Sequence, residues 1–322
     1  AVELENKGFT YSYDMLGEGA RTMADAERYF QSYMMAINVI GKAAQNRGPF
    51  KSPGISVKLS AIHPRYEFSH RDRVMNELVP KLKTLALAAK GYNISFTVDA
   101  EEADRLDLSL DIIEAVFSDD ALGDWGGFGL AVQAYQKRAL FVIEWLVQLA
   151  RRVKRPLMVR LVKGAYWDTE IKTTQQDGLE HFPVFTRKAS TDVSYKACAI
   201  KLLEARDVLY PQFATHNAYT AATILEVAKG NNSGFEFQRL HGMGESLFDQ
   251  IVSSEKIQCR VYAPVGEHEN LLAYLVRRLL ENGANSSFVN AIVDTRQPVE
   301  ALLPDPVETL QGLRNKHNTQ IK

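Results

Sequence analysis

Three charged residues stand inside apolar runs of the sequence. Lys58 lies in ISVKLS, Asp99 ends SFTVD, and Arg160 lies in MVRLV. Each run has the residue types of a buried strand, and burying a charge without a partner is costly. A single such residue is more often a solvated surface charge. Three together indicate ion pairs with one another or a charged ligand.

A second group of charges occupies one predicted helix. Arg277 and Arg278 are adjacent, and Glu281 follows them by four and three residues, within reach of either on a helix. A surface salt-bridge ladder is the simpler interpretation, because exposed pairs are common and contribute little. Two adjacent guanidinium groups can also bind a carboxylate or phosphate through their planar forks. An anionic substrate group is the alternative hypothesis.

A third pattern, RLVKGAYW, runs from Arg160 to Trp167. A cationic strand end followed by small residues lets the backbone approach an anion, and the aromatic side chains can flank a flat ring. The pattern therefore predicts a site for a phosphate and a ring. A tight turn followed by two core aromatics is the competing interpretation.

Several other kinds of site are not indicated. The histidines show no H-x-H or H-E-x-x-H spacing, and Cys198 and Cys259 are far apart, so we expect no metal site and reduced thiols. Neither a G-x-G-x-x-G nor a P-loop pattern occurs. A nucleotide cofactor would have to be held by another device.

Short apolar runs alternate with longer amphipathic runs along the 322 residues. The predicted strands are 9–14, 55–60, 94–100, 128–134, 157–163, 212–216, 235–241 and 259–263. The predicted helices are 23–45, 70–90, 103–117, 137–153, 188–205, 219–229, 245–253 and 267–283, with an extra helix at 168–176. This alternation favours parallel strands joined by helical crossovers. Eight units favour a single-domain α/β fold, a (βα)8 TIM-like barrel.

Polar residues recur where these strands end, which in a barrel is the face that carries chemistry. They are Asp14, Glu18, Lys58, Asp99, Glu101, Glu102, Gln133, Arg160, Lys163, Thr215, His216, Asn217, Gln238, His241 and Tyr262. We expect them to ring one end of the barrel.

Composition excludes other classes. With 38 Lys and Arg against 39 Asp and Glu, the chain has no net field to attract polyanions, so we expect no nucleic-acid binding by this segment. The first residues lack a basic segment followed by an apolar one, and the longest apolar stretch is broken by Glu144 and Gln148. We therefore expect neither a signal peptide nor a membrane span, and a cytoplasmic location.

Nine segments in order along the chain resemble bacterial proline dehydrogenases, most closely the proline dehydrogenase domain of the bifunctional proline utilization flavoproteins. They are YDMLGE at 13–18, SVKLSAIHPRY at 56–66, VDAEE at 98–102, QAYQKR at 133–138, RLVKGAYW at 160–167, FATHN at 213–217, LHGMGE at 240–245, YAPVG at 262–266, and 274–288. The resemblance implies a distorted barrel over 1–288 that binds FAD non-covalently. The tail over 289–322, with Pro298, Pro304 and Pro306 and a polar end, is predicted from its residues to be a C-terminal packing segment that runs into a linker.

The resemblance also implies an activity. L-Proline would be oxidised to Δ1-pyrroline-5-carboxylate by hydride transfer to flavin N5, with electrons passed to a quinone, as the first step of proline catabolism. The family's bifunctional members also carry a DNA-binding segment and an aldehyde dehydrogenase module, which these 322 residues do not include. The parent protein would be a peripheral protein at the cytoplasmic face of the inner membrane.

Site residues follow from the same resemblance. Arg277, Arg278 and Lys58 would bind the proline carboxylate, Tyr262 and Leu240 would pack on its ring, and Tyr166 and Tyr274 would close the pocket. Asp99 would support the charged site, Glu281 would orient Arg278, and Glu18 would gate the pocket. Gln133 and Arg160 would line the flavin ring. The other FAD contacts would be Asp99, Lys163, Gly164, Ala165, Trp167, Thr186, Arg187, Lys188, Thr215, His216, Gln238, Glu281 and Ser287.

Two other functions are compatible with the residues alone. A metal- or Schiff-base-dependent lyase could use Lys58 or Lys163 as the amine, and it would be colourless and trapped by borohydride with a carbonyl substrate. A non-catalytic barrel could use Arg277 and Arg278 as a partner interface, and Arg277→Met would then leave small-molecule affinities unchanged.

Overall fold

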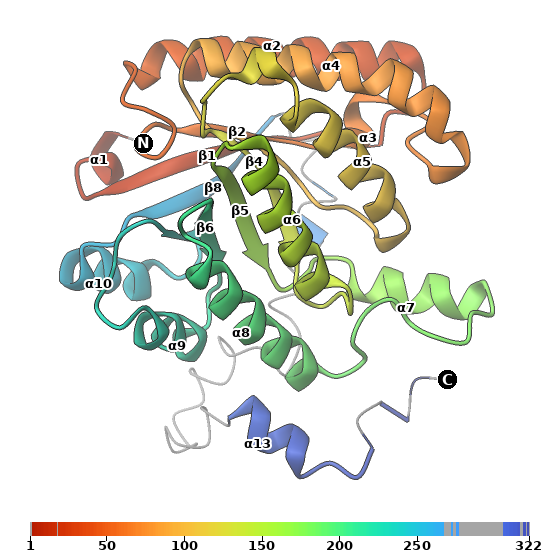
Figure 1. Ribbon diagram of the computed structural model, residues 1–322, viewed down its shortest axis with the longest axis vertical. Helices are drawn as coiled ribbons and strands as arrows, with labels where there is room; N and C mark the ends of the chain where they lie inside the picture. Colours follow the sequence, from red (N-terminus) through yellow and green to blue (C-terminus); the bar gives the residue numbers. More distant parts are fainter. Residues whose placement is uncertain are drawn as a thin grey trace.

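Eight parallel strands close into a barrel in sequence order (Figure 1). The computed structural model describes residues 2–17, 19–266, 272, 275–276, 305–315, 318–319 and 321. The strands are β1 Phe9–Met15, β2 Gly54–Val57, β3 Phe96–Val98, β4 Phe128–Gln133, β5 Leu157–Val162, β6 Leu209–Ala214, β7 Glu236–Leu240 and β8 Cys259–Val265. β8 pairs with β1 in parallel, with Cys259 opposite Phe9. The predicted α/β barrel is confirmed.

Helices surround the barrel and connect its strands (Figure 1). They are α1 Val2–Glu5, α2 Met23–Ala44, α3 Leu59–Ile62, α4 Arg71–Gly91, α5 Leu106–Phe117, α6 Ala139–Val153, α7 Trp167–Gln176, α8 Lys188–Glu204, α9 Ala218–Ala228, α10 Glu245–Glu255 and α13 Pro306–Gln311. The extra helix predicted between the fifth strand and its crossover helix is α7. The predicted helix 267–283 lies almost entirely outside the described residues.

Two local predictions differ from the structure. The strand predicted at 55–60 ends at Val57, because the chain turns at Lys58 into the short helix α3. No helix was predicted within the C-terminal packing segment, yet Pro306 begins α13 there. Asp305 caps this helix by accepting the N–H of Val307, and proline is favoured at the first helical position.

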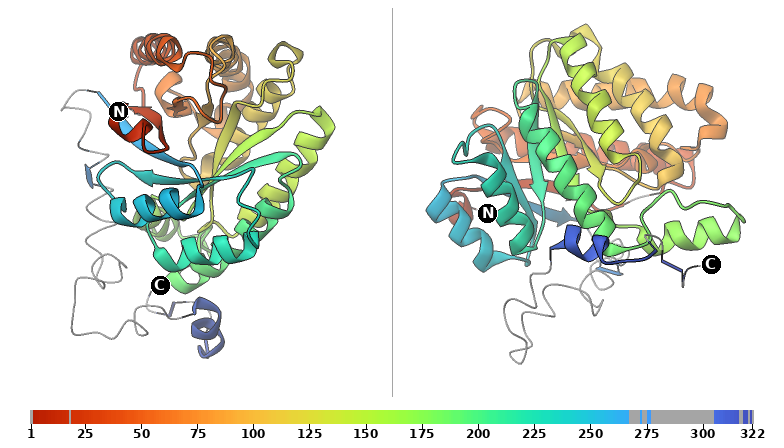
Figure 2. Two further views of the ribbon diagram at one scale, coloured as in Figure 1. Left: turned by 90° about the vertical axis from the view of Figure 1, so that its left-hand side faces the viewer. Right: turned by 60° about the horizontal axis from the view of Figure 1, so that its bottom comes forward.

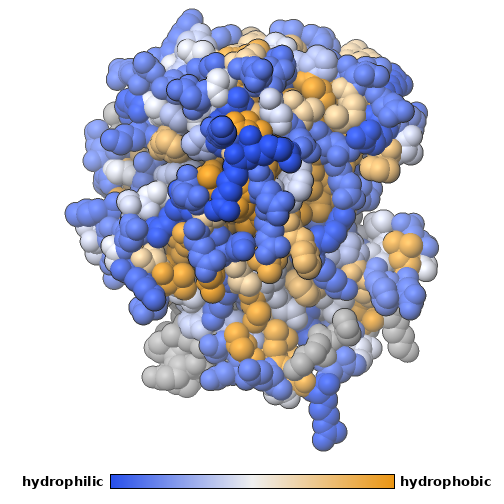
Figure 3. Space-filling model, viewed as in Figure 1, coloured by the Kyte–Doolittle hydropathy of each residue, from blue (hydrophilic) through white to orange (hydrophobic). Residues whose placement is uncertain are grey.

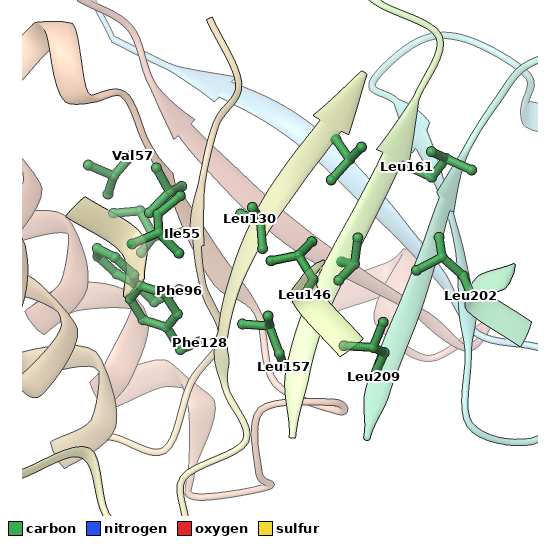
Figure 4. Close-up of a cluster of buried hydrophobic side chains, with 14 of the residues drawn as sticks. Ile55, Val57, Phe96, Phe128, Leu130, Leu146, Leu157, Leu161, Leu202 and Leu209 are labelled. Carbon is green, nitrogen blue, oxygen red and sulfur yellow. The ribbon is translucent and has the colours of Figure 1, made fainter. Parts of the chain in front are cut away.

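The apolar core lies between the strands and the helices rather than inside the barrel. Ile55, Phe96 and Phe128 of the strands are fully buried, and Leu161 of β5 and Leu202 of α8 lie in the same layer (Figure 4). Because side chains alternate across a strand, the intervening residues must face the barrel axis.

The residues that face the axis are largely polar. They are Ser12, Asp14, Ser56, Thr97, Arg160, Gln212, Glu236, Gln238, Arg260 and Tyr262, and all but Tyr262 are at most 4% exposed. Barrels of this type usually fill the axis with Val, Ile and Leu. This interior must therefore be held by hydrogen bonds and ion pairs.

The C-terminal segment packs against the barrel's helical layer. α13 lies beside α8 (Figure 2), where Asp305 accepts a hydrogen bond of 3.2 Å from the Tyr219 hydroxyl and lies 3.6 Å from Lys196 Nζ. The face in Figure 3 is mainly hydrophilic, with hydrophobic residues in its middle and lower parts.

Among the described residues, no helix has the length and apolar character needed to cross a membrane.

Candidate active site

An ammonium ion between two carboxylates forms the centre of the site. Lys58 Nζ lies 2.5 Å from Asp14 Oδ1 and 3.3 Å from Asp99 Oδ2, at the ends of β2, β1 and β3. The three side chains are 7%, 2% and 12% exposed. Burial alone would lower the pKa of Lys58, but the carboxylates of Asp14 and Asp99 raise it well above its ordinary value. Lys58 therefore remains a cation.

Arg160 extends from β5 across the barrel axis and binds side chains on β1, β2 and β7 and at the end of β3. Its Nη1 donates to Asp99 Oδ1 at 2.7 Å, and its Nε donates to Gln238 Oε1 at 2.7 Å. Its Nη2 donates to the hydroxyls of Ser12 and Ser56 at 3.1 and 2.9 Å. Since these bonds use much of its donor capacity, the guanidinium is fixed in one orientation.

Tyr262 connects the two cations. Its hydroxyl donates to Asp99 Oδ2 at 2.8 Å, and the Arg160 guanidinium carbon lies 5.0 Å from its ring centre, in cation–π contact. Burial, reinforced by Asp14 and Asp99, raises the pKa of Tyr262 well above its ordinary value. The hydroxyl stays protonated and acts as a donor to Asp99.

A second buried ion pair forms the floor of the barrel beneath these groups. Arg260 Nε lies 2.7 Å from Glu236 Oε1, and both side chains are at most 1% exposed. The Arg260 guanidinium also donates to the backbone carbonyls of Tyr11, Ser52 and Phe50. The pair thus closes the end of the barrel opposite Lys58.

Two lysines gather beside one carboxylate after β5. Lys163 and Lys188 both pair with Asp192, the second at 3.2 Å. Lys188 is the first residue of α8, and Arg187 precedes it at the helix cap without a side-chain capping bond. Cations at a helix N-terminus provide the donors that a phosphate requires.

The turn between β5 and α7 is set by packing as well as by charge. Gly164 has a φ of +135°, and a Cβ there would lie 2.5 Å from the ring of Tyr135. Ala165 is exposed, Tyr166 caps α7, and Trp167 donates its indole N–H to the carbonyl of Phe185 at 2.9 Å. Gly164, the small residue predicted to let an anion approach, is thus also needed to leave room for the ring of Tyr135.

The remaining predicted cofactor residues lie at the same end of the barrel. The Thr186 hydroxyl accepts the N–H of Asn318, Thr215 accepts that of Asn217, His216 Nε2 accepts that of Leu240 at 2.9 Å, and Gln133 donates to the carbonyl of Glu101. Asn318 brings the C-terminal segment to this rim, a contact that the sequence did not predict.

Six predicted site residues cannot be compared with the structure. Glu18, Tyr274, Arg277, Arg278, Glu281 and Ser287 lie outside the described residues. Their roles remain predictions from the resemblance.

Two carboxylates of the site were not among the predicted functional residues. Asp14, the partner of Lys58, was noted only for its place at the end of the first strand. Glu101 is buried and accepts the N–H of Ser60 at 3.0 Å while pairing with Arg105. Burial raises the pKa of Glu101. The signal for both was their position directly at a strand end.

The arrangement defines a class of protein: a parallel (βα)8 barrel with buried charged groups at the C-terminal ends of its strands, the end at which barrel enzymes carry their active sites. In the described ranges, no three His, Cys, Asp or Glu side chains form a group that could hold a metal ion. Comparison with known proteins narrows the class.

The proline dehydrogenase family profile matches residues 1–291. The chain is 57% identical over 320 residues to the bifunctional protein PutA of Klebsiella aerogenes, covering 97% of this chain and 24% of that protein. It is 26% identical over 291 residues to proline dehydrogenase 1 of Bacillus subtilis, covering 89% and 82%. The chain therefore belongs to the proline dehydrogenase family.

Solved structures agree with the fold. A crystal structure of Bradyrhizobium japonicum proline utilization A matches with a TM-score of 0.94 and 61% identity, over 97% of this chain and 32% of that one. Proline utilization A of Bdellovibrio bacteriovorus, inactivated by N-propargylglycine, matches with a TM-score of 0.90 and 30% identity, over 96% and 34%. The chain spans about a quarter of the length of the curated PutA relatives that it matches.

Proposed function

We propose that this chain oxidises L-proline to Δ1-pyrroline-5-carboxylate with a non-covalently bound FAD. The observation that carries the proposal is the state of Lys58. Among the described residues, two of its three N–H donors point to Asp14 and Asp99. The third N–H is therefore available to a substrate carboxylate. Membership in the proline dehydrogenase family supports the same substrate.

The donor set around the rim fits FAD. Lys163, Lys188 and the start of α8 supply cations and backbone N–H groups suited to a pyrophosphate. Gln133 and Arg160 would border the flavin ring, and Trp167, which is 36% exposed, supplies an aromatic surface. When bound, FAD supplies a ring that accepts hydride at N5 and passes electrons to a quinone.

The protein's own residues would bind and orient the substrate. Arg277, Arg278 and Lys58 would hold the proline carboxylate, and Tyr262, Leu240, Tyr166 and Tyr274 would enclose its ring. The protonated Tyr262 hydroxyl and Arg160 hold Asp99 in place beside Lys58. Positioning of this kind is the main contribution of the protein when a cofactor carries the chemistry. Glu281 would orient Arg278, and Glu18 would gate the pocket.

The lyase alternative is disfavoured by the charge state of Lys58. A Schiff-base amine must be deprotonated to attack a carbonyl, whereas the pKa of Lys58 is raised well above its ordinary value. Lys163 is also paired with a carboxylate, Asp192. Both lysines are thus better suited to bind anions than to act as nucleophiles.

The longer relatives suggest in what kind of protein this chain works. We propose that the chain acts within a longer cytoplasmic protein that also carries an aldehyde dehydrogenase module. This protein would dock peripherally at the inner membrane to meet its quinone acceptor. The relatives named bifunctional PutA, of which this chain spans about a quarter, support this proposal.

A visible absorption spectrum, recorded before and after anaerobic addition of L-proline, tests the proposal. We expect flavin bands that bleach with proline. Flavin bands that stay oxidised would contradict the substrate, and a colourless protein that cannot be reconstituted with FAD would contradict the cofactor. Arg277→Met should weaken binding of proline by about 2–5 kcal/mol, while the exposed-residue control Lys51→Met should not change it.

A further inference from the structure

The floor carboxylate Glu236 is surrounded by hydrogen-bond donors. Arg260 contacts both oxygens, with Nε 2.7 Å from Oε1 and Nη2 3.1 Å from Oε2. The amide nitrogens of Gln212 and Gln238 lie 2.8 and 2.9 Å from Oε1, and that of Gln258 lies 3.0 Å from Oε2. An ionised carboxylate only accepts hydrogen bonds. Each neighbouring glutamine must therefore present its nitrogen to Glu236.

Gln212 demonstrates how strongly Glu236 selects amide orientation. Its nitrogen faces Glu236, while its Oε1 is buried and finds no hydrogen-bond partner among the described residues. Leaving a buried acceptor unpaired has a free-energy cost. The charged carboxylate outweighs that cost and fixes the amide.

The same selection at Gln238 has a consequence for the site above. With its nitrogen toward Glu236, Gln238 turns its Oε1 toward Arg160 Nε, 2.7 Å away. The reversed amide would place its NH2 group against a guanidinium N–H and its oxygen against a carboxylate. Both contacts would be repulsive, so the reversed orientation is excluded while Glu236 is charged.

We propose that Glu236 is a positioning residue that acts through Gln238 to fix the guanidinium of Arg160. A continuous chain of bonds then runs from Glu236 through Gln238 and Arg160 to Asp99, which binds Lys58. The structural part of this inference stands on these contacts. Its effect on the reaction rests on the proposed function, in which Arg160 lies beside the flavin ring.

The structural part is tested on the cofactor-free protein. The Nε–H of Arg160 is followed by NMR in ¹⁵N-arginine-labelled protein, with its signal assigned from its loss in Arg160→Lys. We expect slow hydrogen exchange in the parent protein. In Gln238→Met, which keeps the side-chain length but removes the acceptor, exchange should be about tenfold faster, as expected for a lost bond to a charged group.

Two further variants separate positioning from general loosening. Glu236→Gln combined with Arg260→Met removes both floor charges together, which avoids an unpaired buried charge, and it should accelerate the exchange as Gln238→Met does. Gln258→Met removes another donor to Glu236 that does not contact Arg160, and it should leave the exchange slow. If the paired variant does not fold, Gln238→Met still decides, because unchanged exchange there overturns the proposal. Equal acceleration in Gln258→Met overturns it as well.

The functional part is tested on the FAD-loaded enzyme. Gln238→Met should lower kcat for proline about tenfold with little change in KM and shift the flavin midpoint potential to more negative values, because a less well held cation stabilises reduced flavin less. An unchanged potential and kcat, together with faster exchange of the Arg160 N–H, would overturn the link to catalysis. A protein that never binds FAD would overturn the proposed function and leave the exchange result intact.

Discussion

Lys58 shows how single residues in this barrel depend on partners from other strands. It lies buried at the end of β2, and its two carboxylates come from the ends of β1 and β3. If Asp14 or Asp99 were removed, the remaining carboxylate would be the only one of the two beside the Lys58 ammonium group. A buried ammonium ion that loses a partner strongly destabilises the fold, because its charge is then uncompensated in a place that water does not reach.

Asp14→Asn should therefore affect both stability and substrate binding. The substitution nearly preserves shape but removes the charge that lies closest to Lys58. We expect the free energy of unfolding to fall by about 3 kcal/mol and KM for proline to rise about tenfold, because Lys58 is released toward Asp99. Urea unfolding and steady-state kinetics measure the two effects.

The matched control is Asp177→Asn, since Asp177 is exposed at the end of α7. It should change neither quantity. If Asp14→Asn behaves like this control, Asp14 does not hold Lys58 in solution.

At the scale of elements, the turn after β5 depends on one glycine for two reasons. Gly164 has a positive φ, which strains other residues, and its missing side chain leaves room for the ring of Tyr135 from the turn after β4. Gly178, at the end of the α7 segment, also has a positive φ but has open space around it. The two positions differ in both respects, because a φ of +64° at Gly178 is one that other residues adopt at modest cost, whereas +135° at Gly164 is not.

Gly164→Ala should accordingly destabilise more than Gly178→Ala. Backbone strain alone costs about 1 kcal/mol in Gly178→Ala, and overlap with Tyr135 should add about 1–3 kcal/mol in Gly164→Ala. Denaturant unfolding of the two variants gives the difference directly. Equal losses would mean that movement of the turn and of the Tyr135 ring relieves both the backbone strain and the overlap at Gly164.

The loop between α3 and α4 contains a histidine that is held neutral. The His63 side chain is fully buried, its Nδ1 accepts the N–H of Arg65 at 3.1 Å, and its Nε2 lies 3.2 Å from Glu77. A protonated ring would lose the acceptor at Nδ1. Consistent with this, burial lowers the pKa of His63, although Glu77 opposes the shift.

This lowered pKa predicts a pH-dependent stability. Below about pH 6.5, the unfolded chain binds a proton at this histidine and the folded chain does not. Stability is therefore complete above that pH and is lost as pH falls toward the folded-state pKa. His63→Gln should remove this contribution to the pH dependence of the unfolding free energy below about pH 6.5. The exposed-residue control His181→Gln should keep the parent's slope, and a His63→Gln variant that also keeps the parent's slope would contradict the assignment.

For the molecule as a whole, apolar and polar packing occupy different shells. The hydrophobic layer lies between the strands and the helices and excludes water from that space. The axis of the barrel is instead filled by Arg160, Glu236, Arg260 and their partners. Hydrogen bonds and ion pairs are stronger along this buried axis, because the local dielectric constant is lower than in water. The barrel thereby provides a rigid, dry support beneath the site.

Both cysteines belong to the outer shell, and this predicts their reactivity. Cys198 and Cys259 are buried, and burial raises the pKa of Cys198 to about 11 and that of Cys259 further still. Since the thiolate is the reactive form, neither should react with Ellman's reagent in the native protein. Both should react after unfolding in urea, which serves as the internal control. Rapid labelling of native protein would show that the outer shell opens.

Several features of the fold were predictable because they depend on local periodicity. The eight strands and most helices lie within a few residues of their predicted positions. Charged residues in apolar strands, namely Lys58, Asp99 and Arg160, were expected to need partners, and each has one. The helix α13 was missed because prolines were taken as breakers, although Asp305 and Pro306 form a helix start.

The barrel, the end at which polar residues gather and the family resemblance can be inferred from the sequence, since alternation and motif order are properties of the chain. The groups that meet in the site are known only from the folded structure. Asp14 pairs with Lys58, Gln238 holds Arg160, and Asn318 reaches Thr186 from a distant part of the chain. These pairings depend on the register in which the sheet closes and on where the C-terminal segment packs, and neither is encoded in the spacing of neighbouring residues.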